Sequence, residues 1–277
     1  MIMGLISRIG RIFRKIGKTF RRSEKFVPVY IPVLDTDLLN GRTALITGGG
    51  SGIGFAIAKA FSAAGASVII CGRDIKKLQD AATSIGGQTR IFGLDMTDTA
   101  AFASFVGKVG DFDILVNNAG YVGGGVFGST QISEYDKVLD TNLKGAYFLS
   151  QEVSKLWIAR GVRGNILNVC SASSLRPGES PYILSKWGLR SLTIGMARNL
   201  IKHGIVVNGI APGCTNTEKF CAREREDINN HRNPTGRMVT VQEVANLAVI
   251  MASSLARMVV GDVLYVTGGG AITTLDD

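Results

Sequence analysis

The chain has 277 residues, 45% of them hydrophobic, and carries a formal net charge of +9 at pH 7. This length suffices for one large α/β domain, and no apolar run reaches the roughly 18 residues expected of a membrane-spanning helix. Residues 1–25 hold eight basic side chains and one acid, so they contribute +7 and the rest of the chain only +2. We therefore expect no nucleic-acid-binding surface on the domain that follows.

Residues 1–25 predict a basic amphipathic helix, followed by an extended connector over residues 26–40, which contain two prolines. The apolar face of the helix consists of Leu5, Ile9, Ile12, Ile16 and Phe20. An apolar face opposite arginines and lysines is typical of a helix that binds an anionic membrane surface. A mitochondrial-type targeting peptide and a docking helix for a partner protein share this pattern and remain alternatives.

From residue 41 onward, short apolar strands alternate with helical patterns, which is typical of a parallel sheet with helices on both faces. The predicted strands are Thr43–Ile46, Ser67–Cys71, Arg90–Leu94, Ile114–Asn117, Asn165–Cys170, Ile205–Ile210 and Val263–Val266. They predict an α/β fold of the Rossmann type, a doubly wound parallel sheet of about seven strands in one domain over residues 41–277. Ligands of such sheets bind at the carboxyl ends of the strands, near the point where the strand order reverses.

A glycine-rich loop joins the first predicted strand to the next helix, in the sequence Thr47-Gly48-Gly49-Gly50-Ser51-Gly52-Ile53-Gly54. Glycines let the backbone turn sharply and approach a pyrophosphate closely. The helix N-terminus behind the loop offers free N–H groups and the positive end of a dipole to an anion. At the start of an α/β domain, such a loop predicts dinucleotide binding.

The second predicted strand ends at Gly72-Arg73-Asp74, and this end distinguishes the two nicotinamide dinucleotides. An acid at this position accepts a hydrogen bond from the ribose 2′-hydroxyl of NAD, whereas an arginine accommodates the 2′-phosphate of NADP. Arg73 comes first, so we expect NADP(H). NAD(H) is the alternative, because Asp74 lies directly beside the arginine.

Tyr182 and Lys186 are four residues apart on a predicted helix, and Ser171 follows the preceding predicted strand. Positions i and i+4 share one face of a helix. An ammonium beside a phenol stabilises the ionised phenol, so the tyrosine can exchange a proton with an alcohol or a carbonyl. The pair also occurs on ordinary exposed helices, and it gains weight here from the glycine loop upstream.

The chain has four cysteines, Cys71, Cys170, Cys214 and Cys221, and two histidines. No Cys-x-x-Cys pair occurs, and the first two cysteines lie in apolar, strand-like runs. We expect reduced, mostly buried thiols in a cytoplasmic protein, and no zinc site or other metal site.

The motifs occur in the order of the short-chain dehydrogenase/reductase family, which the chain resembles from about Leu38 to about Gly270. The glycine loop matches the cofactor loop of that family. The other matching segments are Asp95 after the third strand, Asn117-Asn118-Ala119-Gly120 after the fourth, the active-site set Asn142, Ser171, Tyr182 and Lys186, and Pro212-Gly213 followed by Thr217.

The resemblance implies a role for each matching residue. Tyr182 is expected to be the general acid in reduction and the general base in oxidation, with Lys186 beside it and on the nicotinamide ribose. Ser171 is expected to hold the substrate oxygen, and Asn142 to connect Lys186 to solvent through water. The residues expected to bind the cofactor are Gly48, Ser51, Gly52, Ile53, Gly54, Arg73, Asp95, Met96, Asn118, Ala119, Gly120, Tyr182, Lys186, Pro212, Gly213, Thr215 and Thr217.

The resemblance implies an NADP(H)-dependent oxidoreductase that interconverts a secondary alcohol and a ketone, as a homodimer or homotetramer. The basic helix favours a cytoplasmic protein bound peripherally to a membrane, with a lipid-like or lipid-linked substrate; targeting to an organelle is the alternative. Two other functions remain open: an NAD(H)-dependent dehydrogenase of the same family, and a nucleotide-sensing scaffold without turnover. The substrate pocket is expected between Ala172–Pro181, Gly120–Gly128 and the charged segment after Thr217.

Overall fold

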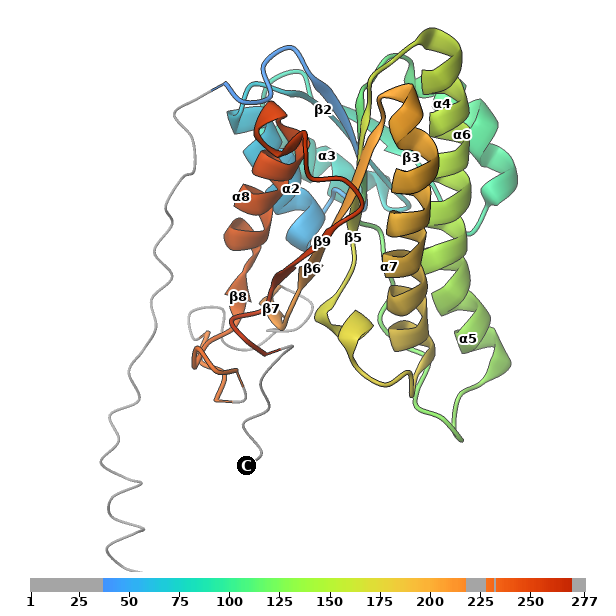
Figure 1. Ribbon diagram of the computed structural model, residues 1–277, viewed down its shortest axis with the longest axis vertical. Helices are drawn as coiled ribbons and strands as arrows, with labels where there is room; N and C mark the ends of the chain where they lie inside the picture. Colours follow the sequence, from blue (N-terminus) through green and yellow to red (C-terminus); the bar gives the residue numbers. More distant parts are fainter. Residues whose placement is uncertain (1–36, 218–227, 232, 271–277) are drawn as a thin grey trace, which may run out of the picture.

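Seven apolar runs form the strands of one parallel sheet in the computed structural model, which describes residues 37–217, 228–231 and 233–270 (Figure 1). The strands are β1 (Thr43–Thr47), β2 (Ser67–Gly72), β3 (Arg90–Gly93), β4 (Ile114–Asn117), β5 (Asn165–Val169), β6 (Val206–Pro212) and β9 (Val263–Val266). The predicted Rossmann-type fold is confirmed, with every predicted strand end within two residues of the observed one. The predicted basic helix and most of the connector lie outside the described residues.

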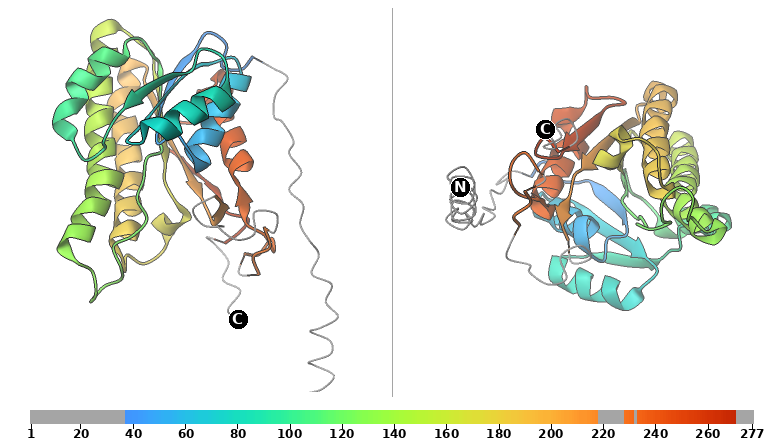
Figure 2. Two further views of the ribbon diagram at one scale, coloured as in Figure 1. Left: turned by 180° about the vertical axis from the view of Figure 1, so that it is seen from behind. Right: turned by 90° about the horizontal axis from the view of Figure 1, so that it is seen from below.

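Helices cover both faces of the sheet, as the views from the front, from behind and from below show (Figures 1 and 2). One face is covered by α2 (Gly52–Ala63), α3 (Ile75–Ile85) and α8 (Val241–Ala252). The other is covered by α4 (Phe102–Val109), α6 (Gly145–Arg160) and α7 (Pro181–Leu200), and the shorter α5 (Ile132–Leu139) precedes α6.

Alternation along the strands divides the core between these two layers. In β1, Ala44 and Ile46 belong to the hydrophobic cluster with α2 and α8, whereas Leu45 belongs to the cluster with α4 and α6. Successive side chains of a strand point to opposite faces, so a strand buried on both sides is a continuous apolar run. The uninterrupted run Ala44–Ile46 therefore marks a central strand, and it pairs with β2 on one side and β4 on the other.

The strand order places the candidate site. Across the sheet the order is β3-β2-β1-β4-β5-β6-β9, so the chain builds outward from β1 in one direction and then from β4 in the other. The connections leaving β1 and β4 diverge, and a crevice opens between them at the carboxyl ends of the strands. A two-stranded sheet of β7 (Thr215–Asn216) and β8 (Val239–Thr240) lies toward this end of the molecule (Figure 1).

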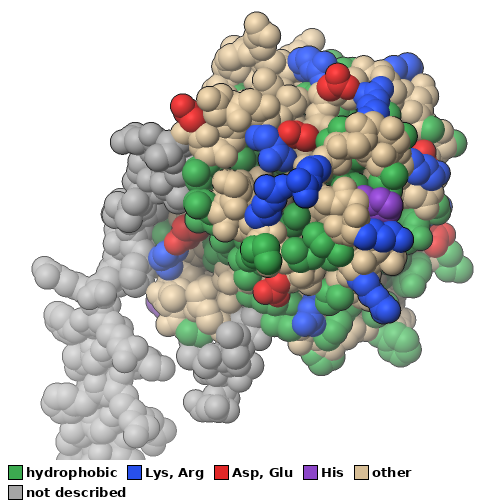
Figure 3. All heavy atoms as spheres, turned by 45° about the horizontal axis from the view of Figure 1, so that its top comes forward, with side chains coloured by type: hydrophobic (Ala, Val, Ile, Leu, Met, Phe, Trp, Pro, Cys, Tyr) green, Lys and Arg blue, Asp and Glu red, His purple; other side chains and the backbone are tan. Residues whose placement is uncertain are grey.

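The end of the molecule uppermost in Figure 1 carries charges of both signs. Figure 3 shows basic and acidic side chains interspersed there. Ion pairs connect Arg42 to Asp113 (2.5 Å) and Arg160 to Asp111 (2.6 Å) at the loops preceding β1 and β4. None of the helices in the described ranges combines the length and apolarity needed to cross a bilayer.

Candidate active site

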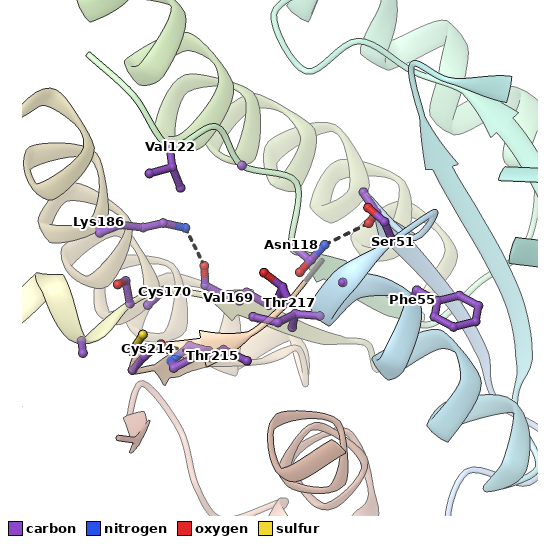
Figure 4. Close-up of a pocket in the computed structure, with 18 of the residues that line it drawn as sticks. Ser51, Phe55, Asn118, Val122, Val169, Cys170, Lys186, Cys214, Thr215 and Thr217 are labelled. Carbon is purple, nitrogen blue, oxygen red and sulfur yellow. Dashed lines mark hydrogen bonds between the residues drawn. The ribbon is translucent and has the colours of Figure 1, made fainter. Parts of the chain in front are cut away.

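A cavity of about 1590 Å³ opens at the carboxyl ends of the strands (Figure 4). Its walls come from the loops after β1, β2, β4, β5, β6 and β9, from the first turns of α2 and α7, from α3, and from Asn230 and Asn233. Pockets for drug-sized ligands have roughly 300–1,000 Å³. This cavity therefore has room for an extended dinucleotide and a second small molecule together.

The glycine loop forms one wall and is tied closely to the loop after β4. Gly48 has φ +66°, and a Cβ there would lie 3.0 Å from the Cα of Ala119, so only glycine fits without strain. Asn118 donates its side-chain N–H to the backbone oxygens of Thr47 (2.9 Å) and Gly48 (3.2 Å). Thr47 Oγ1 in turn accepts from the backbone N–H groups of Asn118 and Ala119 (both 3.0 Å). A side chain at Gly54 would collide with Asn118, so this glycine serves close packing.

The N-terminus of α2 has the properties of an anion site. Ser51 precedes the helix without capping it through its side chain, and no acidic residue occurs in the first turn. Ser51, Gly52 and Ile53 line the cavity. The first N–H groups of a helix have no partner within the helix, and together with the dipole they favour a negatively charged ligand. The wall therefore fits the pyrophosphate of a dinucleotide.

The end of β2 presents a basic side chain to the cavity. Arg73 and Lys77 both line it. Asp74 instead caps α3, because its Oδ1 accepts the backbone N–H of Lys77 at 3.1 Å. Asp74 is thus already engaged by its own helix, whereas the two basic side chains beside it line the cavity.

Asp95 and Met96, both expected at the cofactor, follow β3, and their contact with the cofactor stays a prediction. Asp95 accepts hydrogen bonds from the backbone N–H and hydroxyl of Thr97 (both 2.9 Å), which lower the pKa of its carboxyl group. Met96 and Ala119 line a smaller space of about 90 Å³ beside the main cavity, since Gly48 and Arg73 line both. The main cavity does not include Asp95 in its wall.

Tyr182 and Lys186 enter the cavity from the first two turns of α7. The helix begins with Ser180, whose hydroxyl accepts the N–H of Ile183 (3.3 Å), and with Pro181 in its first turn. Lys186 is 4% exposed, and its Nζ donates to the backbone oxygen of Val169 at 2.9 Å, which Figure 4 shows as a dashed line. The same Nζ lies 5.8 Å from the centre of the Tyr182 ring. Both side chains line the cavity, so the predicted helical pair shares one wall.

Ser171 lies at the end of β5, where three serines occur in four positions. Its Oγ accepts the N–H of Ser173 (3.1 Å) at the start of the 3₁₀ turn Ala172–Leu175. Ser171 and Ser173 line the cavity. Ser174 is fully buried and bonds to the backbone oxygen of Ser171 (2.7 Å) and to the hydroxyl of Tyr265 (3.1 Å). The structure thus points Ser171 toward the site and Ser174 into the protein.

Asn142 is buried in a π-helical turn, Asp140–Lys144, between α5 and α6. Its Oδ1 accepts the backbone N–H of Tyr121 (2.7 Å), and its Nδ2 donates to the backbone oxygen of Tyr121 (3.0 Å) and to Ser185 Oγ (3.0 Å). Ser185 donates its hydroxyl to the backbone oxygen of Tyr182 (2.7 Å). The Asn142 side chain therefore connects the loop after β4 to the first turn of α7. Its expected role in a water relay to Lys186 stays a prediction.

The segment after β6 closes the cavity from the other side. Pro212, Gly213, Thr215 and Thr217 line it, and a Cβ on Gly52 would lie 3.7 Å from the Thr217 side chain. The segment 218–227, expected to cover the substrate, lies outside the described residues.

Several lining residues were not expected from the sequence. They are Phe55, Lys77, Cys214, Asn230, Asn233 and Thr267 among others, whereas Val122 and Arg176 lie in the two loops that were expected to form the substrate pocket. Lys77 had a usable signal, since it lies one helical turn from Arg73 at the start of a predicted helix. Asn230 and Asn233 had none, because only the fold brings them to the cavity.

The cysteines of the described ranges form no disulfide. Cys71 and Cys170 are buried, and Cys214 is exposed. Burial raises the pKa of the Cys170 thiol to about 11 and raises that of Cys71 as well. Both thiols are therefore protonated at neutral pH. In the part of the chain that the structure describes, no three His, Cys, Asp or Glu side chains gather into a metal site.

Comparison with known proteins extends over most of the chain. The family model described as enoyl-(acyl carrier protein) reductase matches residues 48–271. Gluconate 5-dehydrogenase of Gluconobacter oxydans is 36% identical over 246 residues, which cover 83% of this chain and 95% of the relative. Galactitol 2-dehydrogenase of Agrobacterium fabrum is 36% identical over 251 residues, with 83% and 98% covered. A 3-oxoacyl-(acyl-carrier-protein) reductase of Rickettsia prowazekii is 33% identical over 236 residues, with 83% and 97% covered.

Solved structures that superpose on this chain are likewise named as dehydrogenases or reductases. A short-chain type dehydrogenase/reductase from Mycobacterium marinum superposes with a TM-score of 0.77 at 29% identity, covering 87% of this chain and all of the other. A protein provisionally assigned as a 2-deoxy-D-gluconate 3-dehydrogenase of Agrobacterium tumefaciens, solved with bound NADP, gives a TM-score of 0.77 at 33% identity. This superposition also covers 87% of this chain and all of the other.

Proposed function

Because the chain belongs to the short-chain dehydrogenase/reductase family, we propose that it interconverts a secondary alcohol and a ketone by hydride transfer with NADP(H). One observation carries the proposal: Tyr182, Lys186 and Ser171 share a cavity with an uncapped, acid-free helix N-terminus behind a glycine loop. That combination provides a proton donor and an anion cradle in a single space. Gluconate, galactitol and a 3-oxoacyl chain, after which relatives are named, each offer a secondary alcohol or a ketone within a longer chain.

Tyr182, Ser171 and Lys186 have different roles in the proposed reaction. In reduction, the Tyr182 hydroxyl gives its proton to the carbonyl oxygen, and Ser171 donates a hydrogen bond to the same oxygen as charge develops on it. Lys186 keeps a positive charge beside the phenol oxygen that is left, and Val169 orients that ammonium through the 2.9 Å bond. In oxidation the proton moves the other way, from the alcohol to the Tyr182 oxygen. When bound, the nicotinamide supplies or accepts the hydride at the reacting carbon.

Arg73 and Lys77 are the reason for preferring NADP(H) over NAD(H). Two cations line the cavity at the end of β2, and the neighbouring acid Asp74 is engaged as the cap of α3. A 2′-phosphate is an acceptor for charged donors, and such bonds are about twice as strong as neutral ones. NAD(H) is the alternative cofactor, and it requires no contact with Arg73.

The Tyr182→Phe variant tests the proposed chemistry, because it retains the ring and removes only the hydroxyl. We expect kcat with a ketone to fall by about 10²- to 10⁴-fold, while the affinity for NADPH, measured by fluorescence titration, stays unchanged. Tyr135→Phe, on the exposed face of α5 and away from the cavity, is the matched control and should keep full activity. Retained activity in Tyr182→Phe would refute the role of the tyrosine. Tight NADPH binding without NADPH oxidation across a broad panel of ketones would favour a nucleotide-sensing scaffold.

An oligomer is the second part of the proposal, as a homodimer or homotetramer. The faces of α6 and α7 turned away from the sheet carry exposed apolar side chains: Tyr147, Phe148, Ile158, Leu184, Trp187 and Ile194. On α7 these positions lie on one side of the helix, which favours burial against another copy. Light scattering should give a multiple of the 29.5 kDa chain mass, and Ile194→Glu should shift it toward the monomer. A monomeric wild-type protein at micromolar concentration would contradict this assembly.

The third part concerns residues 1–25, which lie outside the described residues. Their basic, amphipathic pattern supports peripheral binding of a cytoplasmic enzyme to anionic lipid. The full chain should co-sediment with vesicles containing phosphatidylglycerol at low salt, and residues 26–277 alone should not. If the full chain ignores these vesicles, organelle targeting or docking to a partner protein becomes the better interpretation of the segment.

A further inference from the structure

Arg176 is a cation in the cavity that the proposed chemistry does not use. It follows the 3₁₀ turn Ala172–Leu175, lines the same cavity as Ser171 and Tyr182, and is exposed there. Among the described residues it forms no ion pair, and neither does Glu179, the nearest acid along the chain. Within the described residues, no carboxylate engages its guanidinium.

The backbone of Arg176 is held against the helix that carries Tyr182. Its N–H donates to the backbone oxygen of Ser173 (3.1 Å), and its own carbonyl accepts the indole N–H of Trp187 (2.6 Å). Trp187 lies one turn beyond Tyr182 on α7, and its ring is covered by the guanidinium of Arg190 at 5.5 Å. Arg176 therefore keeps a defined position relative to the proposed proton donor.

Arg176 belongs to the substrate end of the cavity and not to the end that would take the 2′-phosphate. Arg73 follows β2, whereas Arg176 follows β5, and β1 and β4 lie between these two strands. Three strand spacings separate the two positions by about 14 Å. Arg73 and Arg176 therefore enter different parts of the cavity, and each can bind an anion of its own.

Among the described residues, the cavity walls do not balance the charge of Arg176. The acid that lines the cavity within the described residues is Asp80, which lies on α3 at the Arg73 end. Lys186, the other cation near Tyr182, donates to a neutral carbonyl and adds to the positive potential. The described walls carry four basic side chains and one acid, and such an excess of positive charge concentrates anionic ligands.

We propose that the substrate carries an anionic oxygen group, a carboxylate or a phosphate, which Arg176 binds while the reacting carbon lies at Ser171 and Tyr182. A guanidinium binds such groups through two parallel hydrogen bonds. The inference rests on the proposed oxidoreductase function and names the class of its substrate. Along the 3₁₀ turn the Cα atoms of Ser171 and Arg176 are about 10 Å apart, so the anionic group is several bonds away from the reacting carbonyl.

Pairs of ketones that differ in one charged group but are similar in shape test this proposal. 5-Keto-D-gluconate and L-sorbose differ by a carboxylate in place of a hydroxymethyl group, and D-fructose 6-phosphate and D-fructose differ by a phosphate. NADPH oxidation with each is measured for the wild type, Arg176→Ala and Arg176→Lys. Arg198→Ala is the control, since it removes the same charge from an exposed position on α7 that is outside the cavity.

The wild type should prefer the charged member of at least one pair. Arg176→Ala should lower kcat/KM for that ketone by about 10- to 100-fold, mainly through KM, and change the neutral partner by less than about threefold. Arg176→Lys should recover part of the loss, because an ammonium keeps the charge but not the paired geometry. The ketone pair in which Arg176→Ala has this effect shows whether the site binds a carboxylate or a phosphate.

Three results would overturn the inference: no preference for either charged ketone, an equal loss for charged and neutral partners, or no effect of Arg176→Ala. If the wild type oxidises no NADPH with any of the four ketones, the proposed function fails separately. In that case calorimetry on the NADP-loaded protein compares D-gluconate with D-glucitol. A preference for gluconate that Arg176→Ala abolishes supports the anion site, and equal or absent binding refutes it.

Discussion

Glu243→Gln should reduce stability in a way that depends on pH. Glu243 completes a capping box at the start of α8: its Oε2 accepts the N–H of Thr240 (2.8 Å), and its own N–H donates to Thr240 Oγ1 (3.2 Å). Arg237 adds a bidentate pair to the same carboxylate, at 2.6 and 3.0 Å. The backbone oxygen of Arg237 also accepts from Asn233 (2.7 Å), so the pair anchors the segment that reaches the cavity as well as the helix.

The hydrogen bonds from Arg237, and then those from Thr240, lower the pKa of Glu243 from 4.5 to about 2. A difference of this size corresponds to about 3 kcal/mol for a fully buried group. The Glu243 side chain is 40% exposed, so solvent screening reduces the expected contribution to about 1–2 kcal/mol. Because the folded-state pKa is depressed, this stabilisation is complete above pH 4.5 and is lost as the pH falls toward 2.

The assay is urea unfolding of the wild type and Glu243→Gln at pH 7, 5, 4 and 3, followed by circular dichroism. We expect the free energies of unfolding to differ by about 1–2 kcal/mol at pH 7, by less than half of that at pH 3, and to converge as the pH falls toward 2. Glu152→Gln is the control: its carboxylate pairs with Lys155 three residues along one helix, and the expected loss is below about 0.5 kcal/mol. A difference that stays constant from pH 7 to pH 3 would refute the electrostatic explanation.

Two further variants address the cavity. Arg73→Ala should weaken NADPH binding by about tenfold or more and leave NADH binding nearly unchanged in fluorescence titrations; an equal loss for both would mean that Arg73 does not contact the 2′-phosphate. Asn142→Ala leaves the backbone N–H and oxygen of Tyr121 without their partner, so unfolding should become about 2–4 kcal/mol easier in urea. Its kcat should fall at least tenfold, because the first turn of α7 loses the contact through Ser185; a kcat equal to that of the wild type would exclude this positioning role.

The strands could be predicted because each is a short run with a strong local signal. Buried parallel strands are apolar on both faces, so β1, β2 and β4 stand out from the polar segments between them. Residues 1–36 and 218–227 lie outside the described residues, so the predicted basic helix and the charged segment stay predictions.

Parts of the site could be predicted for a similar reason, because their residues are close together in the chain. The glycine loop lies between one strand and one helix, and Tyr182 and Lys186 lie one turn apart on α7. Their spacing alone places each set on a common surface. The cap formed by Asp74 also involves residues that are close together in the chain. Deciding whether Arg73 or Asp74 is the side chain that meets the cofactor, however, required knowing that α3 begins at Ile75.

The amino-acid sequence by itself determined the succession of strands and helices along the chain, the dinucleotide loop and the helical face shared by Tyr182 and Lys186. These features depend on residues that are close together in the chain, where periodicity and glycine content act directly. The tertiary structure decided which side chains face the cavity: Ser171 and not Ser174, Arg176 from its loop, and Lys77 from α3. The direction of a loop side chain depends on hydrogen bonds to distant elements, such as the bond from Trp187 to Arg176, and these contacts exist only once the sheet has brought β5, β6 and α7 together.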